Sequence, residues 1–168
     1  KEEISNAKTI NSNINEFDDF VLAATSGKMI KKDQLGQQKS ILFFYPKDNT
    51  PGCTIEAQDF SANYDLFQQA GYEIYGISRD SIESHDHFKH KQSLPFELIS
   101  DPQQILCQAF DVIKQKNMFG KTINSLERST FIIDEQGEVI KSWQQVEVKN
   151  HVHDVIDFLQ LKHPKKAI

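Results

Sequence analysis

Apolar residues follow two patterns along this chain: short uninterrupted runs and repeats at helical spacing. The clearest run covers residues 41–45 and predicts a strand that is buried on both faces. Pro46 ends the run, because proline donates no hydrogen bond to a sheet. From Cys53 the apolar positions recur at helical spacing until Gly71, so a strand, a tight loop and a helix are expected in this order. The predicted inward positions of the helix are Ile55, Phe60, Tyr64 and Phe67.

The same patterns extend to both sides of this unit. Upstream, two apolar clusters around a Ser-Gly turn predict a hairpin within residues 17–32, followed by a connector over residues 33–39. Downstream, a strand over residues 72–78 would complete a right-handed βαβ unit. The other predicted elements are a helix over 81–92 capped by Ser81, a strand over 96–99, a helix from Asp101-Pro102, a hairpin over 129–143 and a last helix that includes Val152, Val155, Ile156 and Leu159.

These elements predict an α/β protein with a central mixed sheet, flanking helices and an N-terminal β-hairpin. Residues 1–16 are polar and aperiodic, and we expect them to form a flexible N-terminal arm. Residues 17–168 are expected to form a single domain, because a chain of 168 residues has the size of one ordinary domain.

Composition narrows the class of protein further. A hydrophobic content of 38% and a charged content of 26% are typical of soluble globular proteins. The net charge of −5 argues against a nucleic-acid partner, and no apolar run approaches the ~20 residues that span a membrane. Two cysteines do not make a disulfide framework. We expect a cytoplasmic location; since the sequence begins at Lys1 and not at methionine, an N-terminal targeting segment is an alternative.

Cys53 is the first candidate for chemistry, because it lies where the loop meets the helix. The first turn of a helix offers unpaired N–H groups and the positive end of a dipole, which favour the nucleophilic thiolate. The alternative is a small buried cysteine without chemistry. The surrounding Thr-Pro-Gly-Cys-Thr is neither apolar nor periodic, and therefore favours a reactive thiol.

Pro46, Thr50 and Cys53 stand in the spacing P-x-x-x-T-x-x-C, which resembles the active-site motif of peroxiredoxins. The fuller string F-Y-P-K-D-N-T-P-G-C-T-I-E-A is similar to the Q-type subfamily, also called bacterioferritin comigratory protein. The resemblance covers roughly residues 17–162 and is strengthened by further matches in order. It implies a thioredoxin-like fold of the peroxiredoxin type and a thiol-dependent peroxidase that reduces hydrogen peroxide and organic hydroperoxides. The further matching segments are residues 76–80, 98–101, 117–121 and 127–131.

In such an enzyme Cys53 would attack the peroxide and become a sulfenic acid. Thr50 would place its hydroxyl beside the sulfur, Pro46 would exclude water, and the backbone at Gly52 would supply N–H groups. Arg128 lies in Glu-Arg-Ser-Thr-Phe, which resembles the active-site arginine strand of the family, and its planar fork is something that lysine cannot imitate. A salt bridge to a neighbour is the alternative for Arg128.

The sequence leaves the roles of two further residues open. Glu56 either supports the loop around the thiol by accepting hydrogen bonds or has a capping or surface role. Arg79, the only other arginine, follows a predicted strand and is equally consistent with a solvated surface position.

The position five residues after Cys53, where many Q-type members carry a resolving cysteine, is Gln58, and residues 81–92 also lack one. The remaining thiol, Cys107, lies off the face formed by Leu106 and Phe110, and we expect it to be partly exposed. The favoured mechanism is therefore a one-cysteine cycle in which thioredoxin, glutaredoxin or glutathione reduces the sulfenic acid. A two-cysteine cycle with Cys107 resolving is the alternative. The inward positions predicted for the helix of Cys107 are Ile105, Leu106, Ala109 and Phe110.

The resemblance also implies a monomer, and neither a cofactor nor a metal is expected. A disulfide oxidoreductase would require Cys-x-x-Cys, which is absent here. His85, His87 and His90 could form a metal site, but their polar neighbours favour a solvated helix face. A peroxide sensor, in which oxidation of the thiol is a signal, stays open because it needs the same thiolate.

Overall fold

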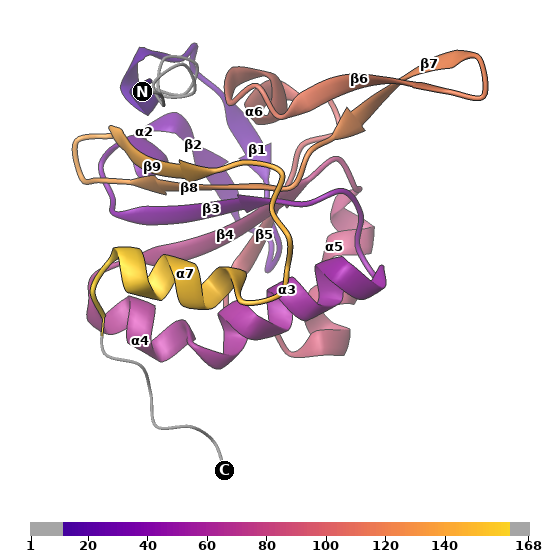
Figure 1. Ribbon diagram of the computed structural model, residues 1–168. Coiled ribbons are helices and arrows are strands. Elements are labelled where there is room, and N and C mark those ends of the chain that lie inside the picture. The colour runs from indigo at the N-terminus through magenta and orange to yellow at the C-terminus, as the bar shows by residue number, and fades with distance from the viewer. Residues whose placement is uncertain (1–11, 162–168) are drawn as a thin grey trace, which may run out of the picture.

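The computed structural model describes residues 12–161 and centres on a five-stranded mixed sheet (Figure 1). β3, β4 and β5 run parallel, whereas β8 pairs antiparallel with both β3 and β9. This arrangement confirms the predicted central mixed sheet. In spatial order the strands are β5 (Glu97–Ser100), β4 (Glu73–Ser78), β3 (Ser40–Phe44), β8 (Ser129–Ile133) and β9 (Val139–Trp143).

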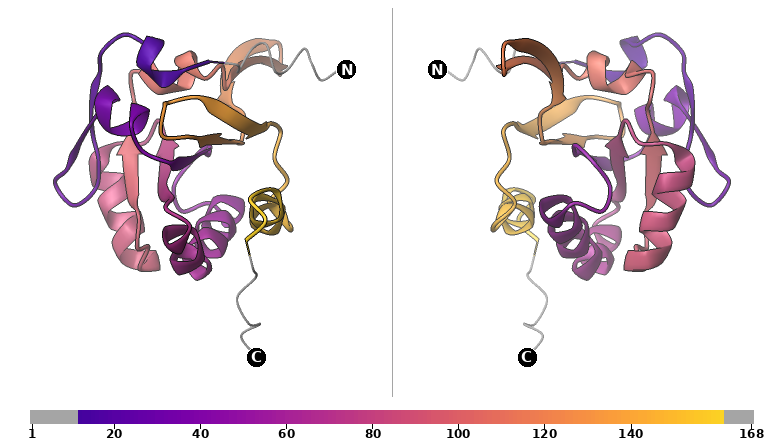
Figure 2. Two further views of the ribbon diagram at one scale, coloured as in Figure 1. Left: turned by 90° about the vertical axis from the view of Figure 1, so that its left-hand side faces the viewer. Right: turned by 90° about the vertical axis from the view of Figure 1, so that its right-hand side faces the viewer.

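Helices cover one face of the sheet, while a hairpin and two short helices cover the other (Figures 1 and 2). β3 is buried along its whole length and separates two hydrophobic cores. Its Ile41 and Phe43 point into the core on the side of the four longer helices, and its Leu42 and Phe44 point into the other core. The four helices are α3 (Pro51–Ala62), α4 (Tyr64–Gln69), α5 (Ile82–Gln92) and α7 (His151–Phe158).

On the opposite face lie the hairpin of β1 (Val21–Ala23) and β2 (Met29–Lys31), α2 (Lys32–Gly36) and α6 (Ile105–Ala109). β1 and β2 pair antiparallel, which confirms the predicted N-terminal hairpin. α2 occupies part of the segment that was predicted to be a connector. Leu35 explains this difference, since it is fully buried and ties the short helix to the core although the segment is otherwise polar.

Two further elements differ from the sequence prediction. The helix expected to run from Cys53 to Gly71 is divided at Asn63 into α3 and α4, and α3 begins two residues earlier, at Pro51. A second hairpin, β6 (Ile113–Met118) and β7 (Lys121–Leu126), projects from the body of the protein and was not predicted (Figure 1). Most of its side chains are exposed, so its sequence lacks the apolar alternation that marks a half-buried strand.

α6 begins at Ile105 and not at Pro102 as predicted. The carboxylate of Asp101, four residues before the helix, accepts hydrogen bonds from the backbone N–H groups of Ile105 and Cys107, both at 2.8 Å. It thereby satisfies N–H groups of the first turn that have no partner within the helix. Ile105 and Ala109 are exposed, although they were predicted to face inward. Cys107 is fully buried, and the expectation of partial exposure was wrong.

The last residues of the predicted N-terminal arm are packed on the domain. Ile14, in the 3-10 helix Ile14–Glu16, is fully buried, and its N–H donates to the carbonyl of Gly137 at 2.8 Å. Asn13 forms a β-bridge with Glu138. The prediction of a flexible arm is therefore wrong for residues 13–16, while residues 1–11 lie outside the described residues.

Candidate active site

Cys53 is buried in the first turn of α3, which follows the loop from the end of β3. Thr50 is the N-cap residue and Pro51 opens the helix, where its missing N–H costs no hydrogen bond. The hydroxyl of Thr50 donates to the carbonyl of Lys47 at 2.8 Å, within the loop itself. The thiol therefore lies where the sequence predicted it, at the N-terminal end of a helix. The first N–H groups of that helix have no partner within the helix.

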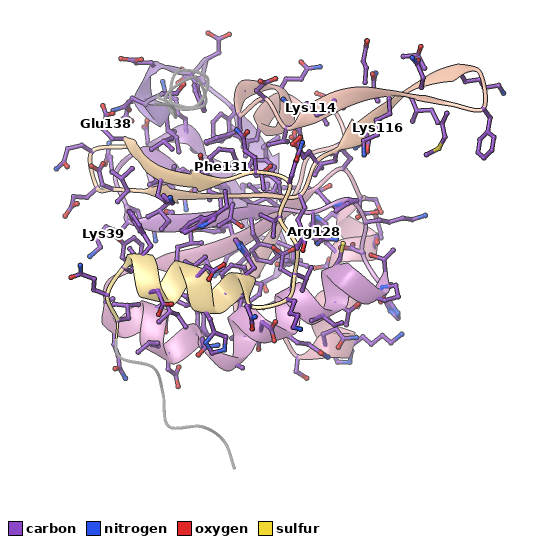
Figure 3. All side chains as sticks on the ribbon, in the orientation of Figure 1. Lys39, Lys114, Lys116, Arg128, Phe131 and Glu138 are labelled. Carbon is purple, nitrogen blue, oxygen red and sulfur yellow. The ribbon has the colours of Figure 1, made fainter. Side chains whose placement is uncertain are left out.

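Arg128, which is labelled in Figure 3, contacts this thiol although the two residues are 75 positions apart in the sequence. Its Nη1 lies 3.5 Å from the Sγ of Cys53 and 2.7 Å from Oε1 of Glu56. Sheet register explains the approach, because Phe44 at the end of β3 pairs with Ser129 at the start of β8. The loop to Cys53 and the residue before β8 therefore meet at one edge of the sheet. Arg128 pairs with Glu56 and not with a neighbour in the sequence, which was the alternative considered for it.

Glu56 is fully buried, so the surface role considered for it is wrong. The buried positions of α3 are Cys53, Glu56, Ala57 and Phe60. This i, i+3, i+4, i+7 pattern places Ile55 on the exposed side, although it was predicted to face inward. Among the residues that the structure describes, Oε2 of Glu56 has no hydrogen-bond partner. Burial raises the pKa of Glu56 to about 7, although the Arg128 guanidinium acts in the opposite direction.

We expect the Glu56→Gln variant to lose a pH dependence of stability that the native carboxyl confers. The folded protein holds the Glu56 proton up to about pH 7, whereas the unfolded chain releases it near the ordinary value of 4.5. The free energy of unfolding therefore falls as pH rises through this window, by about 3 kcal/mol at most. His151 acts in the opposite sense between pH 4 and 6.5, because burial lowers its pKa from 6.5 to about 4.

Urea unfolding of the wild type and of Glu56→Gln, at a series of pH values from about 5 to 8, isolates the contribution of the carboxyl. His151 is present in both proteins, so its titration cancels in the difference. The variant should gain stability relative to the wild type as pH rises. A difference that does not change with pH would mean that Arg128 keeps Glu56 ionised throughout the range.

Gly52 and Pro46 occupy different positions around the thiol. A Cβ added at Gly52 would lie 3.2 Å from Nη2 of Arg128, so the absence of a side chain there allows the guanidinium to approach the helix start. Pro46 is exposed at the beginning of the loop, and its predicted role in excluding water remains a prediction.

Sequence reasoning missed a buried polar cluster beneath the same loop. His85 was assigned to a solvated helix face, but it is fully buried and hydrogen-bonded to Asp48, which is also buried. The available signal was the spacing of His85 and Phe88, which form the buried face of α5, while His87 and His90 are exposed. Arg79 is half-buried and donates to the carbonyl of Asn124 on β7, 3.2 Å away.

The fold and the site together define a class of protein, a thioredoxin-like domain with a buried thiol at a helix start beside a guanidinium group. Residues 14–142 match the AhpC/TSA family, and the chain belongs to this family. The peroxiredoxin Bcp of Xanthomonas campestris is 49% identical over 120 residues, which are 71% of this chain and 75% of that protein. The peroxiredoxin Bcp of Bacillus subtilis is 44% identical over 142 residues, 84% of this chain and 90% of that protein.

Solved structures give the same result. A cysteine-to-serine variant of Xanthomonas campestris peroxiredoxin Q superimposes with a TM-score of 0.81 at 43% identity, covering 84% of this chain and 90% of that one. The predicted thioredoxin-like fold and the resemblance to Q-type peroxiredoxins are thereby confirmed. The chain is therefore a thiol-dependent peroxidase. Within residues 12–161, no helix has both the length and the apolar character needed to cross a membrane.

Proposed function

We propose that Cys53 is the thiol that reduces hydrogen peroxide and organic hydroperoxides. Its thiolate attacks the terminal peroxide oxygen, and an S–O bond forms as the O–O bond breaks. The sulfur is oxidised to a sulfenic acid, and the displaced hydroxide or alkoxide takes up a proton and leaves as water or alcohol. The observation that carries this proposal is the position of Arg128, whose Nη1 lies 3.5 Å from the sulfur at the start of α3.

The groups around the thiol match the charge that develops during this step. Arg128 supplies a fixed cation and several donors, which stabilise the negative charge that collects on the leaving oxygen. The free N–H groups of the first turn of α3 add dipoles of the same sign. Thr50, three residues before Cys53, offers a hydroxyl in the same loop as an orienting group for the peroxide. Glu56 holds the guanidinium in place by accepting a 2.7 Å hydrogen bond from its Nη1.

The sulfenic acid is reduced by an external thiol in a one-cysteine cycle. Cys53 and Cys107 belong to the two different cores, on opposite faces of the central sheet. Cys107 is also fully buried, and burial, together with the neighbouring Asp101 carboxylate, raises its pKa well above the usual range. Such a thiol is a poor nucleophile. A thiol of thioredoxin, glutaredoxin or glutathione would attack the sulfenic sulfur and release water, and a second thiol would reduce the mixed disulfide.

Mass spectrometry of the peroxide-treated protein tests this assignment. We expect a sulfenic or over-oxidised Cys53 beside an unmodified Cys107, because a bridge would need one thiol to cross the sheet. A Cys53–Cys107 disulfide at a yield that follows peroxide consumption would contradict the one-cysteine cycle.

A peroxidase and a peroxide sensor differ in turnover. With excess dithiothreitol, the wild type should consume many equivalents of peroxide per thiol, whereas a sensor would be oxidised once and then react slowly.

The same assay on a monomeric fraction tests whether one copy of the chain is sufficient for activity, as the expected monomer requires. Cytoplasmic location remains part of the proposal and is tested by fractionating cells.

A further inference from the structure

The loop between β3 and α3 is held by a buried carboxylate at its centre, Asp48. Both carboxylate oxygens are hydrogen-bonded: Oδ1 accepts from the hydroxyl of Tyr45 at 2.6 Å, and Oδ2 accepts from the hydroxyl of Ser84 at 2.7 Å. Nδ1 of His85 also lies 2.7 Å from Oδ2. Burial opposes ionisation of Asp48, but the hydrogen bond from His85 and its charge lower the pKa of the carboxyl. The loop is thus tied to the start of α5 through one side chain.

His85 connects this carboxylate to the central sheet. Its Nδ1 faces Asp48, and its Nε2 lies 2.9 Å from the backbone carbonyl of Ile99 on β5. Both partners are hydrogen-bond acceptors, and the ring places one nitrogen against each of them. His85 is fully buried, so both contacts lie in the interior of the protein. The imidazole therefore bridges the loop of the thiol site and a rigid strand.

A second anchor acts on the backbone of the same residue. The N–H of Asp48 donates to Oδ2 of Asp80 at 2.8 Å, and Ser78 at the end of β4 donates to the same oxygen at 2.6 Å. One atom each from Asp48, Asp80 and His85 lie within 4.8 Å of one another, as in a cation site. Each of these three side chains is already hydrogen-bonded within the protein.

We propose that His85 is a positioning residue for the thiol site and acts through Asp48. This inference rests on the proposed role of Cys53. Residues 45–50 form no helix or strand, and Asn49 adopts a left-handed backbone conformation with φ of 63°, so the shape of the loop depends on its side-chain anchors. Thr50 and Cys53 follow Asp48 by two and five residues, and a shift of the loop moves the hydroxyl and the thiol relative to Arg128.

Two substitutions at His85 separate positioning from simple burial. In His85→Asn the side-chain amide replaces Nδ1 and can still donate to Asp48, whereas in His85→Gln it replaces Nε2 and reaches toward the carbonyl of Ile99. Both variants lose the ring. We expect His85→Asn to react with hydrogen peroxide within about threefold of the wild type, and His85→Gln to react about tenfold more slowly. His87→Gln, on the exposed side of the same helix, is the matched control and should not change the rate.

The pH dependence of Cys53 alkylation by iodoacetamide, followed by peptide mapping, gives a readout that does not require activity. The midpoint of this pH dependence should shift in His85→Gln but not in His85→Asn. Thermal unfolding of both variants is recorded in the same experiment. Equal rates and midpoints in the two variants, or losses that only follow the melting temperature, would overturn the proposal. Cys53→Ser, measured in parallel, distinguishes the two failures: if it remains active, the proposed role of Cys53 is wrong, independently of His85.

Discussion

Cys53→Ser should abolish peroxide reduction, whereas Cys107→Ser should retain most of it when an external thiol is supplied. Serine at position 53 has no ionisable sulfur and cannot form the sulfenic acid. Cys107 lies in the other core, across the sheet from the proposed nucleophile. A peroxide-consumption assay with dithiothreitol as the reductant compares the two variants directly, and the expected difference exceeds that of any other substitution.

The folded state of both variants has to be established in the same experiment. Cys107 is fully buried, so replacing it with serine changes a packed site and is expected to lower stability by about 1–2 kcal/mol. The backbone N–H of residue 107 remains available to Asp101, and the start of α6 should persist. If a folded Cys107→Ser protein loses peroxidase turnover, the one-cysteine cycle is wrong and Cys107 takes part in resolution.

Arg128→Lys should slow the reaction with peroxide by roughly a hundredfold although it preserves the positive charge. A single nitrogen of the guanidinium, Nη1, contacts both Cys53 and Glu56. The other N–H groups of the guanidinium are left as donors for the peroxide oxygens. Lysine offers a single ammonium, and removing one preorganised donor from a developing oxyanion costs on the order of 10²-fold or more. The rate of oxidation of the pre-reduced protein by hydrogen peroxide, measured without a reductant, isolates this step.

Arg79→Lys is the matched control, because Arg79 and Arg128 are the only two arginines of the chain. Arg79 donates to Asn124 and Gln104 and not to Cys53, and its replacement should change the rate of oxidation little. Reduction of the oxidised protein should also proceed normally in Arg128→Lys. Equal losses in the two variants would indicate a general effect of arginine on the fold and would remove Arg128 from the proposed chemistry.

Local order was predictable wherever the pattern of one segment decides its own structure. The apolar run at residues 41–45 became the central strand, nearly to the residue, because a strand buried on both faces requires continuous apolar side chains. Ser81 caps α5 as expected, since its hydroxyl accepts from the N–H of Ser84. The residue types around Cys53 placed the thiol where the loop meets a helix, and it lies in the first turn of α3, although that helix begins two residues earlier than predicted, at Pro51.

Side-chain environments followed the pattern less well, because they depend on what arrives from elsewhere in the chain. Ile55 is exposed and Glu56 is buried, since Arg128 comes from a segment beyond the hairpin of β6 and β7 and supplies the hydrogen-bond donor that a buried carboxyl group requires. His85 is buried for a similar reason, because Asp48 and the carbonyl of Ile99 provide acceptors for its two nitrogens.

By itself the sequence determined the order of the main elements, the family and the identity of the candidate nucleophile, because each of these is written in neighbouring residues. The tertiary structure alone decided that Cys53 and Cys107 lie on opposite sides of the sheet and that Arg128 reaches the sulfur. The physical reason is the register of β3 with β8, together with the alternation of side chains across β3. Pairing between distant strands sets the register, and no local pattern encodes it; the alternation along β3 then directs its side chains into the two cores.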